Sequence, residues 1–267
     1  MIIDGNKIAK ALEDKLATEL LFSSRKKVYF VVFGGNAATE QFVKMKMRVA
    51  ERMGIIAEIK RFPEVISTEV AVRIVKALSK EDCDGIVVQL PLTAGLDTQT
   101  VLDAIAPTKD IDVLGTVAKT SYASGKINRT PPVAQAIFEI LQYANVEPKG
   151  KNIVVVGKGR LVGEPIKLML ERMLLKCNVV DSKTSDNEKQ SLLKNADIII
   201  SGAGIPHSIK PEMVKEGVIL IDAGTSEQAG KLVGDIDPVC ESKASFITPV
   251  PGGVGPITIV SVLRNLL

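Results

Sequence analysis

Residues 153–165 read IVVVGKGRLVGEP, an apolar run that leads into three closely spaced glycines. Four β-branched residues in succession favour a buried strand, and Gly157, Gly159 and Gly163 favour a turn into a helix. Glycines at such a turn let the backbone approach a pyrophosphate, and the N-terminus of the next helix supplies N–H donors. The spacing G-x-G-x-x-x-G is one residue longer than the usual dinucleotide fingerprint, so a purely structural turn is the alternative.

Apolar runs alternate with amphipathic stretches on both sides of this motif. Further strands are predicted over 28–33, 55–59, 85–89, 178–180, 197–200 and 218–221. Helices are predicted over 39–53, 68–78, 133–143 and 257–267. Strands without polar alternation are typical of parallel sheets covered on both faces. The sequence therefore predicts an α/β fold with two domains, the second a doubly wound, Rossmann-like domain.

The domain boundary is predicted at Thr130-Pro131-Pro132, where two prolines interrupt the alternation. The loop over 249–256 is followed by a last apolar stretch that we expect to return to the first domain. The predicted domains are therefore 1–130 plus 250–267 for catalysis and 131–249 for the dinucleotide. A length of 267 residues suits two modest domains of this kind.

The composition argues against several function classes. One His and three scattered Cys argue against a metal centre and a dithiol redox pair. A net charge of +3 with interspersed signs argues against nucleic-acid binding, and no apolar run is long enough for a membrane helix. We therefore expect a cytoplasmic protein with no metal, no nucleic-acid partner and no membrane contact.

Several segments together resemble the family of methylenetetrahydrofolate dehydrogenase/cyclohydrolases. They are 88–92 (VQLPL), 109–112 (KDID), the loop over 157–165, 233–235 (VGD) and 247–258 (ITPVPGGVGPIT). The last segment is long and unusual, and the likeness extends over essentially the whole chain. The resemblance implies oxidation of 5,10-methylenetetrahydrofolate to the methenyl form and hydrolysis of that form to 10-formyltetrahydrofolate. It also implies an active site in the cleft between the domains and a homodimer formed through the cofactor domains.

The resemblance assigns catalytic roles to Lys46, Gln89 and Asp112. Lys46 would move protons in the hydrolysis, Gln89 would orient the lysine, and Asp112 would bind the amine edge of the pterin. Without the resemblance, Lys46 could extend along a core face, Gln89 could cap the Pro91 turn and Asp112 could be a solvated charge. The stretch Pro251, Gly252 and Gly253 would form a wall of the folate pocket, with a rigid hinge as the alternative.

Position 42 departs from the family pattern. The family has a Tyr four residues before the catalytic lysine, and this chain has Phe42. Residues four apart share a helix face, so Phe42 can stack on the same ligand that Lys46 contacts. It lacks the hydroxyl that would organise the lysine or a water molecule. The sequence therefore predicts an intact dehydrogenase and a weakened cyclohydrolase.

The cofactor signals conflict. Asp181 lies where an acidic residue would hold the ribose of NAD, whereas Ser182, Lys183 and Lys158 could hold a 2′-phosphate. The family usually has Arg-Ser at Lys158 and Gly159, and a His at Asp181. We predict NADP, with NAD as the alternative. The expected cofactor-binding residues are Thr130, Gly157, Lys158, Gly159, Val162, Gly163, Asp181, Ser182 and Gly224.

The sequence is also compatible with two other functions. A different two-domain Rossmann dehydrogenase would need its own catalytic constellation and would leave the segment over 250–258 unexplained. A catalytically silent nucleotide-binding protein would treat Phe42 as a mark of lost activity. A cofactor-dependent assay for methenyltetrahydrofolate separates all three.

Overall fold

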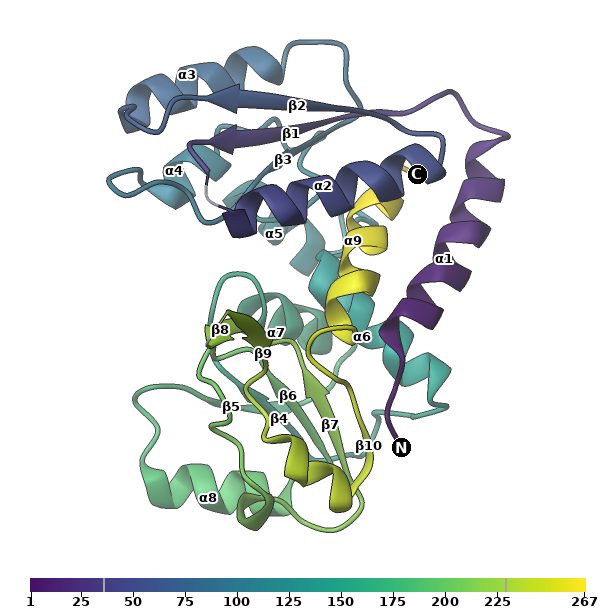
Figure 1. Ribbon diagram of the computed structural model, residues 1–267, viewed down its shortest axis with the longest axis vertical. Coiled ribbons are helices and arrows are strands. Elements are labelled where there is room, and N and C mark those ends of the chain that lie inside the picture. Colours follow the sequence, from purple (N-terminus) through teal and green to yellow (C-terminus); the bar gives the residue numbers. More distant parts are fainter. Residues whose placement is uncertain (36, 229) are drawn as a thin grey trace. The chain divides into compact units, whose positions relative to one another are not determined.

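The computed structural model describes residues 1–35, 37–228 and 230–267 (Figure 1). These residues form two compact units. The three-stranded unit comprises residues 11–132 and 259–267, and the five-stranded unit comprises residues 1–10 and 133–258. No helix in the described ranges is long and apolar enough to cross a membrane.

The three-stranded unit is built around a parallel sheet in the order β2-β1-β3. Its strands are β1 (Lys27–Phe33), β2 (Ile56–Phe62) and β3 (Gly85–Val88). Its helices are α2 (Ala37–Arg52), α3 (Thr68–Leu78), α4 (Thr98–Leu102) and α5 (Thr116–Ala123). The central strand β1 is buried from Val28 to Phe33, as expected for a strand with neighbours on both sides and apolar residues throughout.

The five-stranded unit contains a parallel sheet in the order β10-β7-β6-β4-β5. Its strands are β4 (Ile153–Val156), β5 (Cys177–Val180), β6 (Ile198–Ser201), β7 (Val218–Asp222) and β10 (Ala244–Ile247). The helical elements are α6 (Pro132–Tyr143), α7 (Gly163–Arg172), α8 (Asp186–Asn195) and the short 3₁₀ helices η1 (Pro211–Met213) and η2 (Pro238–Ser242). A small antiparallel hairpin joins β8 (Ser226–Gln228) to β9 (Lys231–Val233).

The two remaining helices, α1 (Gly5–Leu20) and α9 (Val254–Arg264), each have residues in both units. The last apolar stretch therefore returns to the three-stranded unit from Ile259 onward, as its sequence position predicts. The α/β fold class and the doubly wound second sheet are confirmed.

The compact units differ from the predicted domain limits at residues 1–10, 131–132 and 250–258. The first residues pair with β10, because the Ile3 N–H donates to Ile247 O at 2.9 Å and the Ile247 N–H donates to Met1 O at 3.0 Å. The Gly5 N–H likewise donates to Gly252 O at 2.9 Å. Both ends of the predicted first domain thus contribute to the five-stranded unit.

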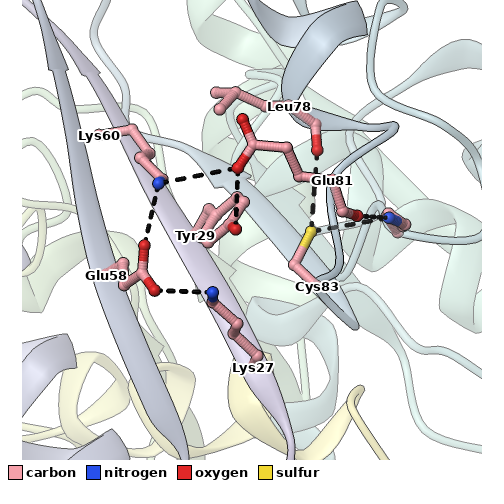
Figure 2. A network of polar contacts seen from close by, with 8 residues as sticks. Lys27, Tyr29, Glu58, Lys60, Leu78, Glu81 and Cys83 are labelled. Atoms are coloured by element: carbon pink, nitrogen blue, oxygen red, sulfur yellow. Dashed lines mark hydrogen bonds and ion pairs between the residues drawn. The ribbon is translucent and has the colours of Figure 1, made fainter.

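A polar network crosses the β1–β2 pair of the three-stranded unit (Figure 2). Glu58 of β2 contacts Lys27 at 2.7 Å and Lys60 at 2.9 Å. Tyr29 of β1 is almost fully buried, and its hydroxyl donates to Glu81 at 3.0 Å. The buried phenol hydroxyl therefore has a hydrogen-bond acceptor, the Glu81 carboxylate in the turn before β3. This hydrogen bond connects the turn to the sheet.

Candidate active site

Lys46 and Gln89 meet in the three-stranded unit. Lys46 lies on α2, and its Nζ donates to Gln89 Oε1 at 3.0 Å. Gln89 directly follows β3 and is 8% exposed, and its Nε2 donates to Leu90 O at 2.7 Å. The bond from Nε2 to Leu90 O fixes the orientation of the Gln89 amide, so that its oxygen faces the lysine. The predicted pairing with Lys46 and the alternative contact at the Pro91 turn are made by the same side chain.

The surroundings of Lys46 favour its neutral form. Burial lowers the pKa of Lys46, while the nearby Asp112 carboxylate opposes that shift. The Lys46 Nζ also lies 5.9 Å from the centre of the buried Phe30 ring. Burial raises the pKa of Asp112, and here the Lys46 cation opposes the shift. The structure thus brings together the three predicted catalytic residues, with an amine whose proton is easier to remove than that of a free lysine.

A tight turn places Asp112. The Asp110 carboxylate is 1% exposed and accepts from the backbone N–H groups of Leu114 at 3.1 Å and Gly115 at 2.8 Å. Within this turn Val113 has a φ of +55°, which is unusual for a β-branched residue. Burial raises the pKa of Asp110 to about 6. No role was predicted for Asp110, because a carboxylate in a polar KDID segment gives no sign that it is buried.

Asn265 near the chain end fixes two neighbouring segments of this unit. Its Nδ2 donates to Ile111 O at 2.8 Å and to Thr130 O at 2.9 Å, and its Oδ1 accepts from the Thr130 N–H at 3.2 Å. The predicted cofactor residue Thr130 is therefore tied to the residue before Asp112. A polar residue at the end of an apolar helix was the only sequence signal for Asn265.

Phe42 lies one helical turn before Lys46 on α2 and is half-buried. The i, i+4 spacing places the ring and the amine on one face of the helix, as predicted. Its stacking on a substrate stays a prediction. Pro251, Gly252 and Gly253 belong to the five-stranded unit, so their place in a folate pocket also stays a prediction.

The glycine loop joins β4 to α7 and brings backbone segments very close together. Gly157 has a φ of +99°, and a Cβ at this position would lie 2.7 Å from Gly202 O. A Cβ on Gly163 would lie 2.0 Å from Gly157 O. Among the described residues no side chain caps the N-terminus of α7 at Val162. These features suit backbone donors that approach a phosphate group, and they place the predicted residues Gly157 and Gly159 in the loop and Gly163 at the first position of α7.

The loop after β5 presents the second part of the predicted cofactor site. Asp181 Oδ1 accepts from the Lys183 backbone N–H at 2.9 Å, and the Asp181 N–H donates to Thr184 Oγ1 at 3.0 Å. The side chains of Ser182 and Lys183 are exposed, as is that of Lys158 in the glycine loop. One carboxylate oxygen of Asp181 thus shapes its own turn, while a hydroxyl and two cations are open to a ligand.

Comparisons with known proteins agree with this geometry. Residues 3–112 match the catalytic domain of the tetrahydrofolate dehydrogenase/cyclohydrolases, and residues 131–267 match their NAD(P)-binding domain. The bifunctional protein FolD of Hydrogenobaculum sp. (strain Y04AAS1) is 37% identical over 271 residues, which cover 100% of this chain and 97% of that protein.

Two solved structures are similar over the same length. The bifunctional FolD methylenetetrahydrofolate dehydrogenase/cyclohydrolase of Campylobacter jejuni has a TM-score of 0.94 at 30% identity, covering 100% of this chain and 96% of that chain. The Trypanosoma brucei methylenetetrahydrofolate dehydrogenase-cyclohydrolase, complexed with NADP cofactor and an inhibitor, has a TM-score of 0.92 at 32% identity, covering 100% and 95%. Both sequence and structure therefore show that the chain belongs to the tetrahydrofolate dehydrogenase/cyclohydrolase family.

Proposed function

We propose that this protein oxidises 5,10-methylenetetrahydrofolate to 5,10-methenyltetrahydrofolate with NADP and hydrolyses the product to 10-formyltetrahydrofolate. The observation that carries the proposal is the Lys46–Gln89–Asp112 cluster, in which a half-buried lysine has a lowered pKa. A catalytically silent nucleotide-binding protein would not need a half-buried lysine held by an oriented amide. A different dehydrogenase would not combine this cluster with family matches in both parts of the chain.

The dehydrogenase step depends chiefly on positioning. NADP, when bound, accepts the hydride that leaves the methylene carbon, and no proton needs to move in that step. The Asp112 carboxylate can accept two N–H bonds from the amine edge of the pterin, which fixes the orientation of the folate. Binding and orientation of this kind reduce the entropic part of the barrier. Asp112 therefore serves this step as a binding group.

The cyclohydrolase step needs proton transfer. Water adds to the methenyl carbon and loses a first proton, which gives the carbinolamine. The carbinolamine opens when its hydroxyl loses the second proton to solvent, the formyl C=O forms and the bond from that carbon to the 5-nitrogen breaks. The proton that the water loses can be accepted by neutral Lys46 and returned to the released 5-nitrogen. Gln89 holds the Lys46 amine in place through the bond at 3.0 Å.

Two absorbance assays test the proposed function. The purified chain with 5,10-methylenetetrahydrofolate and NADP should form methenyltetrahydrofolate, and added methenyltetrahydrofolate should disappear without NADP. Absence of both reactions would favour a silent nucleotide-binding protein. Formation of the methenyl product without its hydrolysis would limit the function to the dehydrogenase.

The substitution Phe42→Tyr is expected to raise the ratio of cyclohydrolase to dehydrogenase activity. The added hydroxyl lies one helical turn from Lys46 and can hydrogen-bond to the amine or to water. A gain of about tenfold in the ratio fits one new hydrogen bond made in the transition state. Comparing both kcat values for the native chain and the variant provides the measurement. A native cyclohydrolase as fast as its dehydrogenase, unchanged by Phe42→Tyr, would refute the proposed weakness.

NADP is the proposed cofactor, and the loop after β5 supports it. Asp181 already accepts a backbone hydrogen bond, whereas Ser182, Lys183 and Lys158 are exposed and can bind a 2′-phosphate. We expect kcat/KM for NADP to exceed that for NAD by at least about tenfold. Only NADP has the 2′-phosphate, and the free energy of one charge-assisted hydrogen bond to it corresponds to about that factor. Ser182→Ala should reduce the NADP value and leave the NAD value unchanged. A preference for NAD above tenfold would overturn this choice.

We further infer a homodimer formed through the five-stranded units. In the described part of the chain β5 has a strand partner on one side only, and an open strand edge can pair with a second copy. Light scattering on the purified chain should give twice the mass of one chain, and the mass of a single chain would refute the dimer. The cytoplasmic location stays a prediction, which fractionation of the source cells would test.

A further inference from the structure

Asp235 is fully buried, and its carboxylate accepts hydrogen bonds from a loop that has no role in the proposed mechanism. Its Oδ2 accepts from Ser201 Oγ at 2.8 Å and from the Ala203 N–H at 2.7 Å. The same oxygen accepts from the Gly204 N–H at 3.3 Å, and Oδ1 accepts from the Ile205 N–H at 2.8 Å. One carboxylate thus gathers the end of β6 and the loop over 202–205 around itself.

A second buried carboxylate locks Asp235 in place. Asp222, at the end of β7, accepts from the Gly224 N–H at 3.0 Å and from the Ile236 N–H at 2.8 Å. A Cβ on Gly224 would lie 2.2 Å from Asp235 Cγ, so only glycine lets this segment approach the carboxylate so closely. Three loops that are distant in sequence are therefore fastened together around Asp235.

This arrangement lies at the edge of the sheet where Rossmann-like folds bind their cofactor. Val156, Ser201 and Asp222 are neighbours in register at the carboxyl ends of β4, β6 and β7. The loop over 202–205 also lies against the glycine loop, because a Cβ on Gly157 would be 2.7 Å from Gly202 O. Ligands of doubly wound sheets bind at the carboxyl ends of the strands.

The strand order separates the two halves of the site. β4, which leads into the glycine loop, has β5 on one side and β6 on the other. The loop after β5 carries Asp181 and Ser182, which stand at the position that recognises the ribose of the adenosine half. The loop after β6 lies on the opposite side of the glycine loop and is therefore adjacent to the nicotinamide half.

We propose that Asp235 is a positioning residue for the dinucleotide, acting through the 202–205 loop on the nicotinamide half and leaving the adenosine half unaffected. It touches neither substrate nor cofactor. Its three hydrogen bonds from the backbone N–H groups of residues 203–205 keep that backbone in one conformation, so that the loop is preorganised before the dinucleotide binds. The inference rests on the proposed function, because it takes the dinucleotide to be bound at this sheet edge.

Asp235→Asn tests the inference, since the variant keeps the shape but replaces one acceptor oxygen with a donor. Calorimetry on the purified full chain should show that Kd for NADP rises by at least about tenfold. Adenosine 2′,5′-bisphosphate, which lacks the nicotinamide half, should bind with a Kd within twofold of the native value. The cyclohydrolase rate, which needs no dinucleotide, should also stay within twofold.

Asp237→Asn is the matched control. Asp237 lies two residues further along the chain and is half-buried. Within the described residues its side chain accepts one hydrogen bond, from the Val239 N–H at 2.9 Å. All three measurements should be native-like in this control. An unchanged Kd for NADP in Asp235→Asn would overturn the inference, and so would equal weakening of NADP and the bisphosphate.

Ser201→Ala keeps the test decisive if Asp235→Asn does not fold. It removes one donor to Asp235, and we expect a rise of about threefold in Kd for NADP with unchanged bisphosphate binding. A native Kd for NADP in this variant would contradict the inference. Failure of the proposed function is distinguishable, because then the native chain itself would bind no NADP or hydrolyse no methenyltetrahydrofolate.

Discussion

Replacing Lys46 by Gln is expected to lower the cyclohydrolase kcat by about 10²–10⁴-fold, the usual range for loss of a general acid–base group. The amide cannot accept and return a proton at neutral pH. The dehydrogenase should lose less, within about tenfold, because hydride transfer needs positioning only. The measurement is the rate of methenyltetrahydrofolate disappearance without NADP, set against its rate of formation with NADP.

Lys44→Gln provides the matched control for Lys46→Gln. Lys44 is a second lysine on the same helix, and it is exposed. Both activities should be native-like in this variant, which separates a general charge effect from proton transfer. Equal losses of the two activities in Lys46→Gln would mean that Lys46 serves binding or folding, and the proposed proton transfer would be wrong.

Asp112→Asn is expected to raise KM for the folate substrate by about 10–100-fold in both reactions. The carboxylate offers two acceptors to the amine edge of the pterin, and charge-assisted hydrogen bonds have free energies that correspond to this factor. The exposed Asp82 gives the control Asp82→Asn, which should leave both KM values unchanged. An unaltered folate KM in Asp112→Asn would contradict the binding role.

The same variant should also shift the pH dependence of the cyclohydrolase. Lys46 accepts a proton only when neutral, so the rate rises as pH rises through the pKa of Lys46. Asp112 raises that pKa against the effect of burial, and removing the carboxylate therefore lowers it further. The rising limb of the pH–rate profile should move to lower pH in Asp112→Asn. An unmoved profile would mean that Asp112 does not act on the pKa of Lys46, and a shift to higher pH would contradict the sign of the predicted effect.

The fold could be predicted wherever burial determines the residue types. The apolar runs at 28–33 and 153–156 are parallel strands, and the 3.6-residue period at 68–78 gives the observed bounds of α3. The β8–β9 hairpin was not predicted, because its strands have only three residues each and are largely exposed. Residues 1–10 join the five-stranded unit through backbone bonds to β10, and such bonds leave no trace in side-chain patterns.

The candidate site was predicted only in part. Lys46, Gln89 and Asp112 were named because the resemblance to the family gave each residue a role, and the structure places them together. Asp110 and Asp235 were not assigned roles, since their importance lies in the backbone N–H groups that they accept from. Every residue carries such a group, so no residue type in the sequence marks those partners.

The most direct test of the central claim is an absorbance measurement on the purified native chain. With 5,10-methylenetetrahydrofolate and NADP together, the proposed function predicts accumulation of methenyltetrahydrofolate at a rate proportional to enzyme concentration. Omission of either reactant should abolish the signal. A chain that binds NADP but forms no methenyltetrahydrofolate would contradict the proposed function.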